Sequence, residues 1–191
     1  MRFPAYPNYK PSGVEWHGEV PEHWEVVRVR HCFQNLDHRR FPVSGEDHSS
    51  LEKIYPYYGA SGIIDYVDEY LFGETLILVA EDGANLLSRS TPLAFLATGK
   101  YWVNNHAHIL KPVFGDIRYW LGVPQAYDCT PLVTGAAQPK LTSERLGSIA
   151  LPQPPSGEQR AIANFLNRET AKTDTLVSKV ETAIERLQEY R

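Results

Sequence analysis

The stretch GAAQPKLTSERLGSIALPQPPSGEQRAIANFL, residues 135–166, divides the chain into two kinds of sequence. Before it, short apolar runs alternate with loops, and after Pro155 one helical pattern continues to the last residue. Ser156 is a good N-cap, and Gln159 stands three residues later, which is the spacing of a capping box. The stretch therefore predicts a long helix that begins near Gly157.

The predicted helix carries a heptad seam, whose positions recur alternately four and three residues apart and are apolar except for Glu169 and Thr173. The seam consists of Ile162, Leu166, Glu169, Thr173, Leu176, Val180, Ala183, Leu187 and Tyr190. At about 1.5 Å per residue the helix forms a rod of about 50 Å. Its six basic and six acidic residues balance, whereas a phosphate-binding helix normally carries excess base. We expect a dimerisation helix that contacts protein, the alternative being an amphipathic helix lying on its own domain.

The composition indicates one globular domain that carries this helix as an appendage. Of the 191 residues, 42% are hydrophobic and 12% are aromatic, which suffices for one sizeable core. Cys32 and Cys129 form no metal or disulfide pattern by spacing, and the N-terminal sequence does not resemble a signal peptide. No run of residues reaches membrane-spanning length. We therefore expect a cytoplasmic protein without a membrane segment.

The formal net charge is −4, and because the helix is neutral, all of it belongs to residues 1–157. An acidic domain argues against a bulk electrostatic attraction to nucleic acid. Any DNA binding then depends on a local basic patch, or on partner subunits that supply the phosphate contacts.

Short β-branched and apolar runs in residues 1–157 predict strands, and glycine-rich or proline-rich segments predict turns. Strands are expected at the start of Trp24–Phe33 and at residues 63–67, 75–80, 93–97, 102–103, 107–111 and 148–151. Residues 63–67 should be half-buried with alternating faces, and residues 75–80 should form a central strand. Tyr55–Gly62 is expected to be a tight turn, and Asp37–Asp47 a loop.

Two short helices complete the predicted domain. Asp116 is expected to cap a helix that ends at Gly122 or Pro124, and Thr142 or Ser143 to cap a single turn. The predicted fold class is therefore α+β, with a mixed β-sheet domain, short helices and one long C-terminal coiled-coil helix.

Motifs of catalysis are weak in this chain. The sequence contains neither G-x-x-x-x-G-K-[ST] nor a strand-linked G-x-G-x-x-G, and Glu81 lacks the following lysine that a metal-dependent nuclease would need. His106 and His108 could share a strand face as metal ligands, but without a third ligand a hydrogen-bonded histidine pair is favoured. Gly59 and Gly62 form a GxxG, which is more often a plain turn than a nucleic-acid clamp. We predict no catalytic residue and no metal site.

Amide, hydroxyl and basic side chains gather in the predicted loops, and these are the candidate DNA contacts. They are Arg39, Arg40, Tyr58, Ser61, Arg89, Lys100, Tyr101, Asn104, Asn105, His106, Gln138 and Lys140. Arginine and lysine can read guanine, asparagine and glutamine can read adenine, and tyrosine can stack or reach a phosphate. Because polar residues populate loops in any protein, composition alone favours an ordinary surface.

Six blocks of the sequence resemble the specificity subunit of type I restriction-modification enzymes. In chain order they are YPNYKPSGVEWHGEVPEHWEVVRV, YPYYGASGIIDYV, ILVAEDGANL, YWVNNHAHILKP, GAAQPKLTSERLGSIALPQPP and SGEQRAIANFL. The resemblance implies a target recognition domain at residues 1–157 and a spacer helix at 158–191, in a half-length form with one recognition domain instead of two.

The same resemblance implies a non-catalytic subunit that binds one half of a bipartite site in double-stranded DNA. Such a subunit docks modification (methyltransferase) subunits, can dock a restriction subunit, and here is expected to form a homodimer through its helix. It needs no cofactor of its own, because S-adenosylmethionine, ATP and magnesium are expected only in the partner subunits.

The resemblance does not identify the base-reading residues. Asn104–His106 and Gln138–Lys140 fall inside the shared blocks, so they are expected to shape loops or grip the DNA backbone. Arg39, Arg40, Arg89 and Lys100 fall outside the family-like pattern and are the better candidates for specificity. Two other hypotheses are a decoy that occupies modification subunits without reading DNA, which the acidic domain favours, and an autonomous nuclease.

Overall fold

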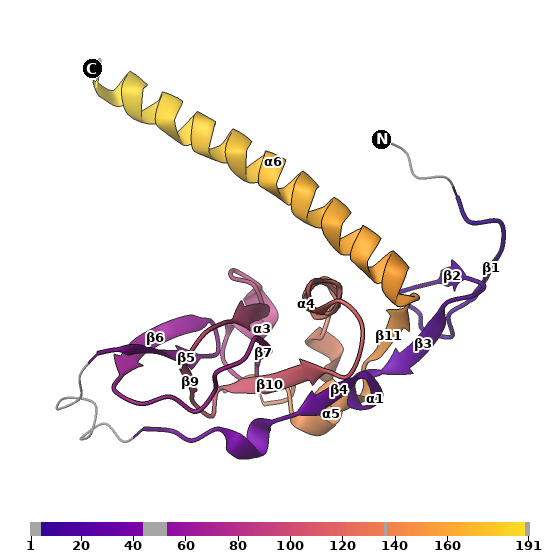
Figure 1. The fold of residues 1–191 in the computed structure, drawn as a ribbon, viewed down its shortest axis with the longest axis horizontal. Helices are drawn as coiled ribbons and strands as arrows, with labels where there is room; N and C mark the ends of the chain where they lie inside the picture. The colour runs from indigo at the N-terminus through magenta and orange to yellow at the C-terminus, as the bar shows by residue number, and fades with distance from the viewer. Residues whose placement is uncertain (1–4, 44–52, 136, 190–191) are drawn as a thin grey trace.

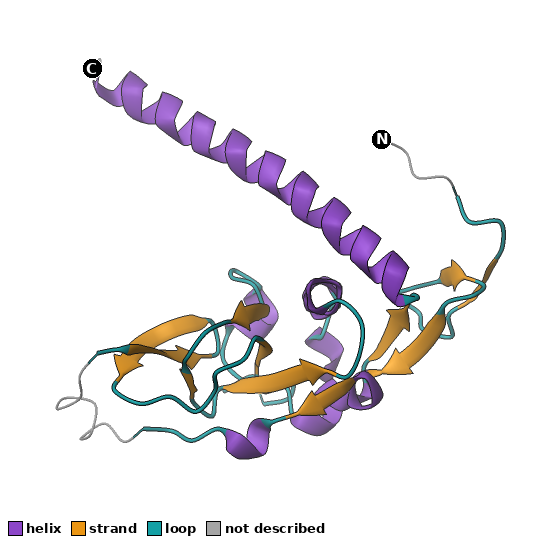
Figure 2. Cartoon of the chain, viewed as in Figure 1, coloured by secondary structure: helices purple, strands orange, loops and turns teal. Residues whose placement is uncertain are grey.

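The structure, a computed structural model, describes residues 5–43, 53–135 and 137–189. Within these ranges, short helices and four small β-sheets form an α+β domain from which one long helix projects (Figures 1 and 2). The predicted fold class is confirmed. The strands are divided among four sheets rather than joined in one mixed sheet.

The largest sheet has four strands in the order β4-β10-β7-β8, and each neighbouring pair is antiparallel. Its strands are β4 (Phe33–Asn35), β10 (Ala107–Pro112), β7 (Leu76–Ala80) and β8 (Ala94–Ala97). All five residues of β7 are buried, so the predicted central strand is confirmed.

This sheet is buried on both faces, which explains why β7 is a continuous apolar run. Ile77 and Val79 belong to the larger core cluster, together with Trp120, whereas Leu76 and Leu78 belong to a second cluster. The alternation follows the two-residue period of a strand, in which successive side chains point to opposite faces. The two clusters hold the sheet between them and make it the scaffold for the loops at its ends.

A three-stranded sheet has the order β6-β5-β9, with β5 (Tyr55–Gly59), β6 (Gly62–Val67) and β9 (Trp102–Val103). The prediction of a turn over all of Tyr55–Gly62 is wrong, since Tyr55–Gly59 is itself a strand and the turn has only two residues. The predicted alternation in 63–67 is also wrong, because Ile63 and Ile64 are 48% and 58% exposed on this edge strand.

The remaining strands form two-stranded antiparallel ribbons. They are β1 (Tyr9–Pro11) with β2 (Glu19–Pro21), and β3 (Glu25–Arg28) with β11 (Ala150–Gln153). The strand predicted at the start of Trp24–Phe33 is confirmed as β3, which passes directly into a helical turn. The ribbon of β3 and β11 brings the beginning of the domain beside the start of the long helix (Figure 1).

Several short helices connect the strands. They are α1 (Val29–Cys32), η1 (Asp37–Arg39), α3 (Asn85–Ser88), α4 (Ile117–Ala126), η2 (Thr130–Leu132) and α5 (Ser143–Ser148). The part of the predicted Asp37–Asp47 loop from residue 44 onward lies outside the described residues.

The predicted caps of α4 and α5 are confirmed. The side chain of Asp116 accepts from the backbone N–H of Arg118, and that of Thr142 from the N–H of Arg145. The predicted end of α4 is wrong, since the helix continues through Pro124 to Ala126. Pro124 lies in the last turn and is buried, so packing holds the helix past a residue that sequence treats as a stop.

The long helix α6 spans Ser156–Glu189 and begins one residue before the predicted start. Its first turns pack on the domain, with Gln159 and Ala163 buried, and Leu166 is already 45% exposed. Beyond that point the helix runs away from the domain (Figure 1). The hypothesis of an amphipathic helix lying on its own domain is therefore wrong. Within the described ranges, none of the helices has the length and apolarity that crossing a membrane requires.

Candidate nucleic-acid interface

Four loops meet at one end of the four-stranded sheet, and we call them the loop cluster. They comprise residues 59–62, 81–84, 104–106, and the strip formed by 134–135 with 137–140. Backbone hydrogen bonds join each loop to the next: Asn104 N to Tyr58 O (3.0 Å), Glu81 N to His106 O (3.0 Å) and Gly83 N to Pro139 O (3.0 Å). The loops are therefore anchored to one another and to the ends of β5, β7 and β10.

A set of buried charges lies beneath the loop cluster. Glu81, 6% exposed, pairs through Oε2 with the guanidinium of Arg40 and through Oε1 with Lys140 Nζ at 3.0 Å. Arg40 also donates to the carbonyl oxygen of Ala107 at 2.7 Å. These bonds connect η1, β7, β10 and the 137–140 strip through one carboxylate. Glu81 thus holds together segments that are far apart in the sequence.

His108, 1% exposed, completes this buried cluster. Its Nδ1 lies 2.6 Å from Asp37 Oδ2, and its Nε2 lies 2.7 Å from the carbonyl oxygen of Leu141. Asp37 Oδ2 and the Leu141 carbonyl oxygen therefore hold the imidazole ring from both sides. Two buried carboxylates, Asp37 and Glu81, face the guanidinium of Arg40 and the His108 ring.

The two carboxylates remain charged despite their burial. Burial opposes ionisation of Asp37, but hydrogen bonds from His108, the Ile109 N–H and Asn35 outweigh it, so the Asp37 pKa lies below its ordinary value. For Glu81, burial is likewise outweighed by Lys140 and Arg40, and its pKa is also lowered. Both carboxylates are therefore anions at neutral pH.

Asp37, Glu81 and His108 place three candidate metal-ligand atoms within 4.8 Å of one another. In this arrangement the guanidinium of Arg40 and the ammonium of Lys140 already occupy the Glu81 carboxylate. Two fixed cations beside the carboxylates disfavour a bound metal ion, so the trio is a structural ion cluster. His106 and His108 do not form a pair, since His106 Nδ1 contacts Asp82 Oδ2 at 2.8 Å and His108 contacts Asp37.

An open hollow of about 400 Å³ lies on the outer side of the loop cluster. Its lining combines glycines with polar side chains that can donate or accept hydrogen bonds, namely Ser61, Asp82, Asn85, Asn104 and His106. Gly59 lets the backbone approach closely here, because a Cβ would lie 3.0 Å from Ile64 Cγ2. The hollow is therefore a concave surface built on fixed backbone, in which polar groups stand among a mostly apolar lining.

Six of the predicted contact residues do come together in the loop cluster: Ser61, Asn104, Asn105, His106, Gln138 and Lys140. Ser61, Asn105, Gln138 and Lys140 are exposed, and the His106 side chain is 45% exposed. Asn104 is only 5% exposed, and its Oδ1 accepts from the His106 backbone N–H at 2.8 Å. Asn104 therefore shapes the loop and is a poor candidate for a DNA contact.

Two aromatic predictions fall in the interior. Tyr101 is fully buried, and its hydroxyl donates to the carbonyl oxygen of Glu74 at 2.8 Å, so the prediction that it contacts DNA is wrong. Tyr58 is half-buried, with its ring 5.6 Å from those of Phe95 and Tyr101, and burial raises the pKa of its hydroxyl. Both rings serve the second core cluster.

The basic residues chosen for specificity are mostly engaged within the domain. Arg40 is part of the buried cluster, with a side chain only 15% exposed, so its assignment as a base reader is wrong. Arg89 has φ 49° and donates to the carbonyl oxygens of Tyr127, at 3.0 Å, and Gln125. It therefore fastens the end of α4 to α3, outside the loop cluster.

Arg39 and Lys100 lie beside aromatic rings, also outside the loop cluster. Arg39 stands 4.7 Å over the Phe72 ring and donates to Leu71 O at 3.3 Å. Lys100 Nζ stands 4.6 Å from the centre of the Tyr70 ring. Neither residue joins the polar groups around the hollow.

Sequence reasoning missed Asp37, Asp82 and Asn85. Asn85 Oδ1 accepts from the Thr91 N–H at 2.9 Å, which fixes the segment after α3. The available signal was the Glu81-Asp82-Gly83 turn directly after a buried strand, since side chains at strand ends are often functional. Asp37 could not be found in this way, because its partner His108 lies 71 residues away.

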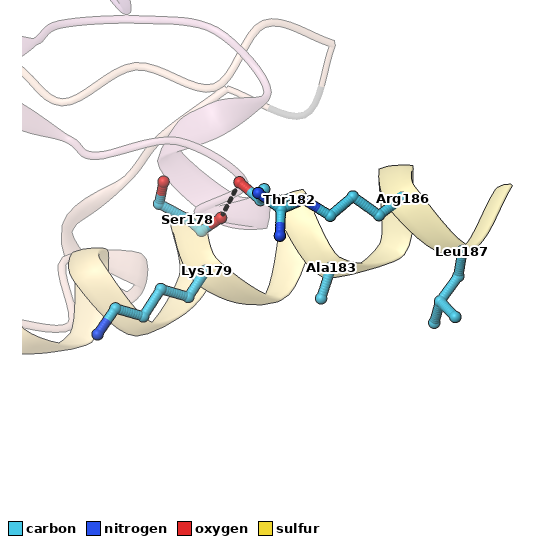
Figure 3. Close-up of a pocket in the computed structure, with 6 residues that line it drawn as sticks. All are labelled: Ser178, Lys179, Thr182, Ala183, Arg186 and Leu187. Atoms are coloured by element: carbon cyan, nitrogen blue, oxygen red, sulfur yellow. Dashed lines mark hydrogen bonds between the residues drawn. The ribbon is translucent and has the colours of Figure 1, made fainter. Parts of the chain in front are cut away.

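A second exposed surface lies on α6. Leu166, Leu176, Val180 and Leu187 of the predicted seam are 45%, 62%, 50% and 70% exposed. A hollow of about 530 Å³ lies along the far turns of the helix, where Ala183 and Leu187 point to one side and Thr182 turns its hydroxyl to Ser178 on the other (Figure 3). Tyr190, the last seam position, lies outside the described residues.

Comparison with known proteins identifies relatives of the whole described fold. A family model described as the type I restriction modification DNA specificity domain matches residues 21–186. A Haemophilus influenzae protein assigned as a type I restriction enzyme specificity subunit is 35% identical over 120 residues, which make up 62% of this chain and 30% of that protein.

Solved structures share the fold. The S subunit of a type I restriction-modification system from M. genitalium gives a TM-score of 0.65 at 17% identity, over 82% of this chain and 41% of that one. A chain from a structure on assembly and conformational transition of the type I R-M system gives 0.65 at 15% identity, over 94% and 46%. The chain thus spans less than half the length of each of these three proteins.

Proposed function

The chain belongs to the family of type I restriction modification DNA specificity domains, and on this premise we propose that it recognises one half of a bipartite target in double-stranded DNA. It acts as a non-catalytic subunit that docks modification subunits and, in a complete system, a restriction subunit. S-adenosylmethionine, ATP and magnesium would bind those partner subunits. The observation that carries the proposal is the loop cluster, where polar side chains surround a hollow on a rigid base.

The loop cluster suits base recognition because three of its exposed side chains, Ser61, Asn105 and Gln138, are neutral and directional. Asn105 and Gln138 each offer an amide donor and acceptor, the combination that pairs with adenine in the major groove, and Ser61 can serve either role. Backbone bonds and the Glu81 ion cluster hold these loops in place, so little conformational entropy remains to be lost on binding. This favours Ser61, Asn105 and Gln138 over the arginines as base readers.

The charge distribution supports a division of labour between this chain and its partners. Arg39, Arg40, Arg89 and Lys140 all contact carboxylates or carbonyl oxygens of the domain itself. These four cations are thus partly neutralised within the domain, although phosphate contacts dominate the affinity of most DNA-binding proteins. We propose that modification subunits supply most of the phosphate contacts and that this chain selects the sequence.

The test is DNA binding by the chain reconstituted with its modification subunits. Gln138→Ala or Asn105→Ala should lower the preference for the target over a one-base variant by about 5–150-fold, the value of one bidentate base contact. Gln34→Ala, exposed on β4 outside the loop cluster, is the matched control and should leave the preference unchanged. A complex that binds all duplexes equally would overturn the proposal.

We further propose that α6 pairs with α6 of a second copy as an antiparallel coiled coil. Exposed leucine and valine side chains at heptad spacing are costly in water, and a partner helix would cover them. A two-fold dimer carries two identical recognition domains, so its target is a pseudo-palindrome of two half-sites. The helix charges are balanced, which allows self-association.

Sedimentation tests the dimer directly. The chain should sediment as a dimer at micromolar concentration, and Leu176→Glu should make it a monomer. Ser178→Glu, which places the same charge two residues and about 200° around α6 from Leu176, should leave the dimer intact. A wild-type monomer under these conditions would refute self-association.

The neutralised arginines also favour a second candidate, a decoy that occupies modification subunits without reading DNA. Substitution of Arg39 and Arg40 cannot separate the two functions, since Arg40 is part of the folding core. DNA preference separates them, because Gln138→Ala should lower the target preference of a reader, whereas a decoy complex shows no target preference with or without that side chain.

A further inference from the structure

The base of α6 is clamped on two sides by consecutive residues, Glu158 and Gln159. On one side, the Glu158 carboxylate accepts three side-chain hydrogen bonds from the N-terminal segment. Tyr6 Oη donates to Oε2 at 2.6 Å, Trp24 Nε1 donates to Oε2 at 2.9 Å, and His23 Nε2 lies 2.7 Å from Oε1. Together these bonds outweigh partial burial and hold the Glu158 pKa below its ordinary value.

On the other side, Gln159 is fully buried against the start of α4. Its Oε1 accepts from the Asp116 backbone N–H at 3.0 Å, and its Nε2 donates to Pro154 O at 2.9 Å. Gly115 makes room for it, because a Cβ there would lie 2.0 Å from Gln159 Oε1. The predicted capping box is therefore wrong in its contacts, since the Gln159 side chain bonds to these two groups rather than to Ser156.

Both sets of contacts lie at the base of α6, where a small change in the direction of the helix moves its far end by a large distance. Ala163 is the last residue of α6 that is buried on the domain, and the helix continues to Glu189. That free length is ~39 Å at 1.5 Å per residue, so a tilt of ~10° at the base moves the far end by ~7 Å. A displacement of ~7 Å equals ~2 base-pair steps along B-DNA.

We propose that Glu158 and Gln159 are positioning residues that fix the angle at which α6 leaves the domain, and thereby the number of base pairs between the two half-sites. This inference rests on the proposed function, in which two recognition domains are joined through α6. The clamp couples three parts of the chain, since the lead-in segment, α4 and α6 meet at these two residues. It acts on spacing alone, because the loop cluster shares no residue with it.

The test maps methylated sites in cells that carry the chain with its modification subunits. Glu158→Ala should keep the half-site sequence but change the spacer, by a shift of about 1–2 base pairs or by acceptance of two spacer lengths. Glu181→Ala, an exposed glutamate further along α6, should keep both half-site and spacer. Tyr6→Phe combined with His23→Ala removes two donors without touching α6 and should reproduce the effect, even if Glu158→Ala folds poorly.

A second readout follows the helix itself. Spin labels are attached at Thr98→Cys and Ser178→Cys, two exposed positions outside the loop cluster and the heptad seam. Electron paramagnetic resonance then measures the distance between the domain and α6. The labelled protein is diluted with unlabelled chain, so that only distances within one chain are measured. In the Tyr6→Phe, His23→Ala variant the distribution of these distances should broaden by several ångströms. If spacer and distance both match the wild type, the inference is overturned. If wild-type cells show no bipartite site, the proposed function itself fails, which is a different result.

Discussion

Glu81→Met should be among the most destabilising single substitutions in the domain. It removes one carboxylate from between Arg40 and Lys140 and leaves the Arg40 guanidinium, 15% exposed, with only the more distant Asp37 carboxylate at 3.9 Å, so the cost should fall toward the lower end of the range for a broken buried pair. Removing one partner of a buried ion pair costs about 3–5 kcal/mol, because the remaining charge stays buried. A domain of ordinary stability, about 5–15 kcal/mol, would lose about a fifth of it or more.

The assay is urea unfolding, in which the midpoint shifts at unchanged slope if only stability changes. Glu69→Met, at an exposed position of a loop, is the matched control and should change the free energy of unfolding by less than about 0.5 kcal/mol. Lys140→Met should cost at most about 1 kcal/mol, since that side chain is 50% exposed and water screens its charge.

The double variant Arg40→Met, Glu81→Met separates the ion pair from the loss of shape. Replacing both charges by apolar groups of similar volume is often neutral, so the double variant should be more stable than Glu81→Met alone. Two results would refute the reasoning. One is a loss of unfolding free energy below about 1 kcal/mol for Glu81→Met. The other is a loss in the double variant equal to the sum of the losses in Arg40→Met and in Glu81→Met.

Three further predictions use the same unfolding and sedimentation measurements. Gly115→Ala should destabilise by at least about 1 kcal/mol more than Gly99→Ala, since both have positive φ but only at Gly115 does a Cβ meet a side chain; equal costs would contradict this. The free energy of unfolding should fall as pH drops below about 4, because the two buried carboxylates have lowered pKa values and the unfolded chain binds more protons; Glu81→Met should flatten that slope, and an unchanged slope would count against it. Leu187→Glu should weaken self-association as Leu176→Glu does, whereas Thr182→Glu should not.

Local sequence patterns predicted the elements whose surroundings are uniform. The continuous apolar run of β7 predicts a strand buried on both faces, and the heptad seam of α6 predicts an exposed stripe. In both elements, side chains that face the same surroundings recur at the period of the strand or helix. The spacing of apolar residues in the sequence therefore predicts which side chains share a face.

The failures fall where a contact joins distant segments. Arg40 and Tyr101 stand in stretches of loop-like composition, yet Arg40 meets Glu81, and Tyr101 pairs its backbone with Phe72. Pro124 in the sequence predicts the end of a helix, whereas in the fold it is buried in the last turn of α4. The packing around it is not visible in the sequence. Spacing along the chain contains no information about these neighbours. The residue type alone therefore predicts an exposed loop for Arg40 and Tyr101 and a helix end for Pro124, and each prediction is wrong.

The acidic charge of the domain and its proposed recognition of DNA are compatible once the cations are located. Arg40 and Lys140 balance Glu81, and Arg89 binds backbone carbonyls, so these cations stabilise the fold. Apart from Lys140, which pairs with Glu81, the exposed side chains Ser61, Asn105 and Gln138 of the loop cluster are neutral, which favours selectivity over attraction. A surface of this kind binds DNA weakly by itself, and discriminates well when other subunits hold the duplex against it. The contacts of Glu158 and Gln159 would serve the same recognition. A complex that reads two half-sites needs the distance between its two recognition domains to be fixed.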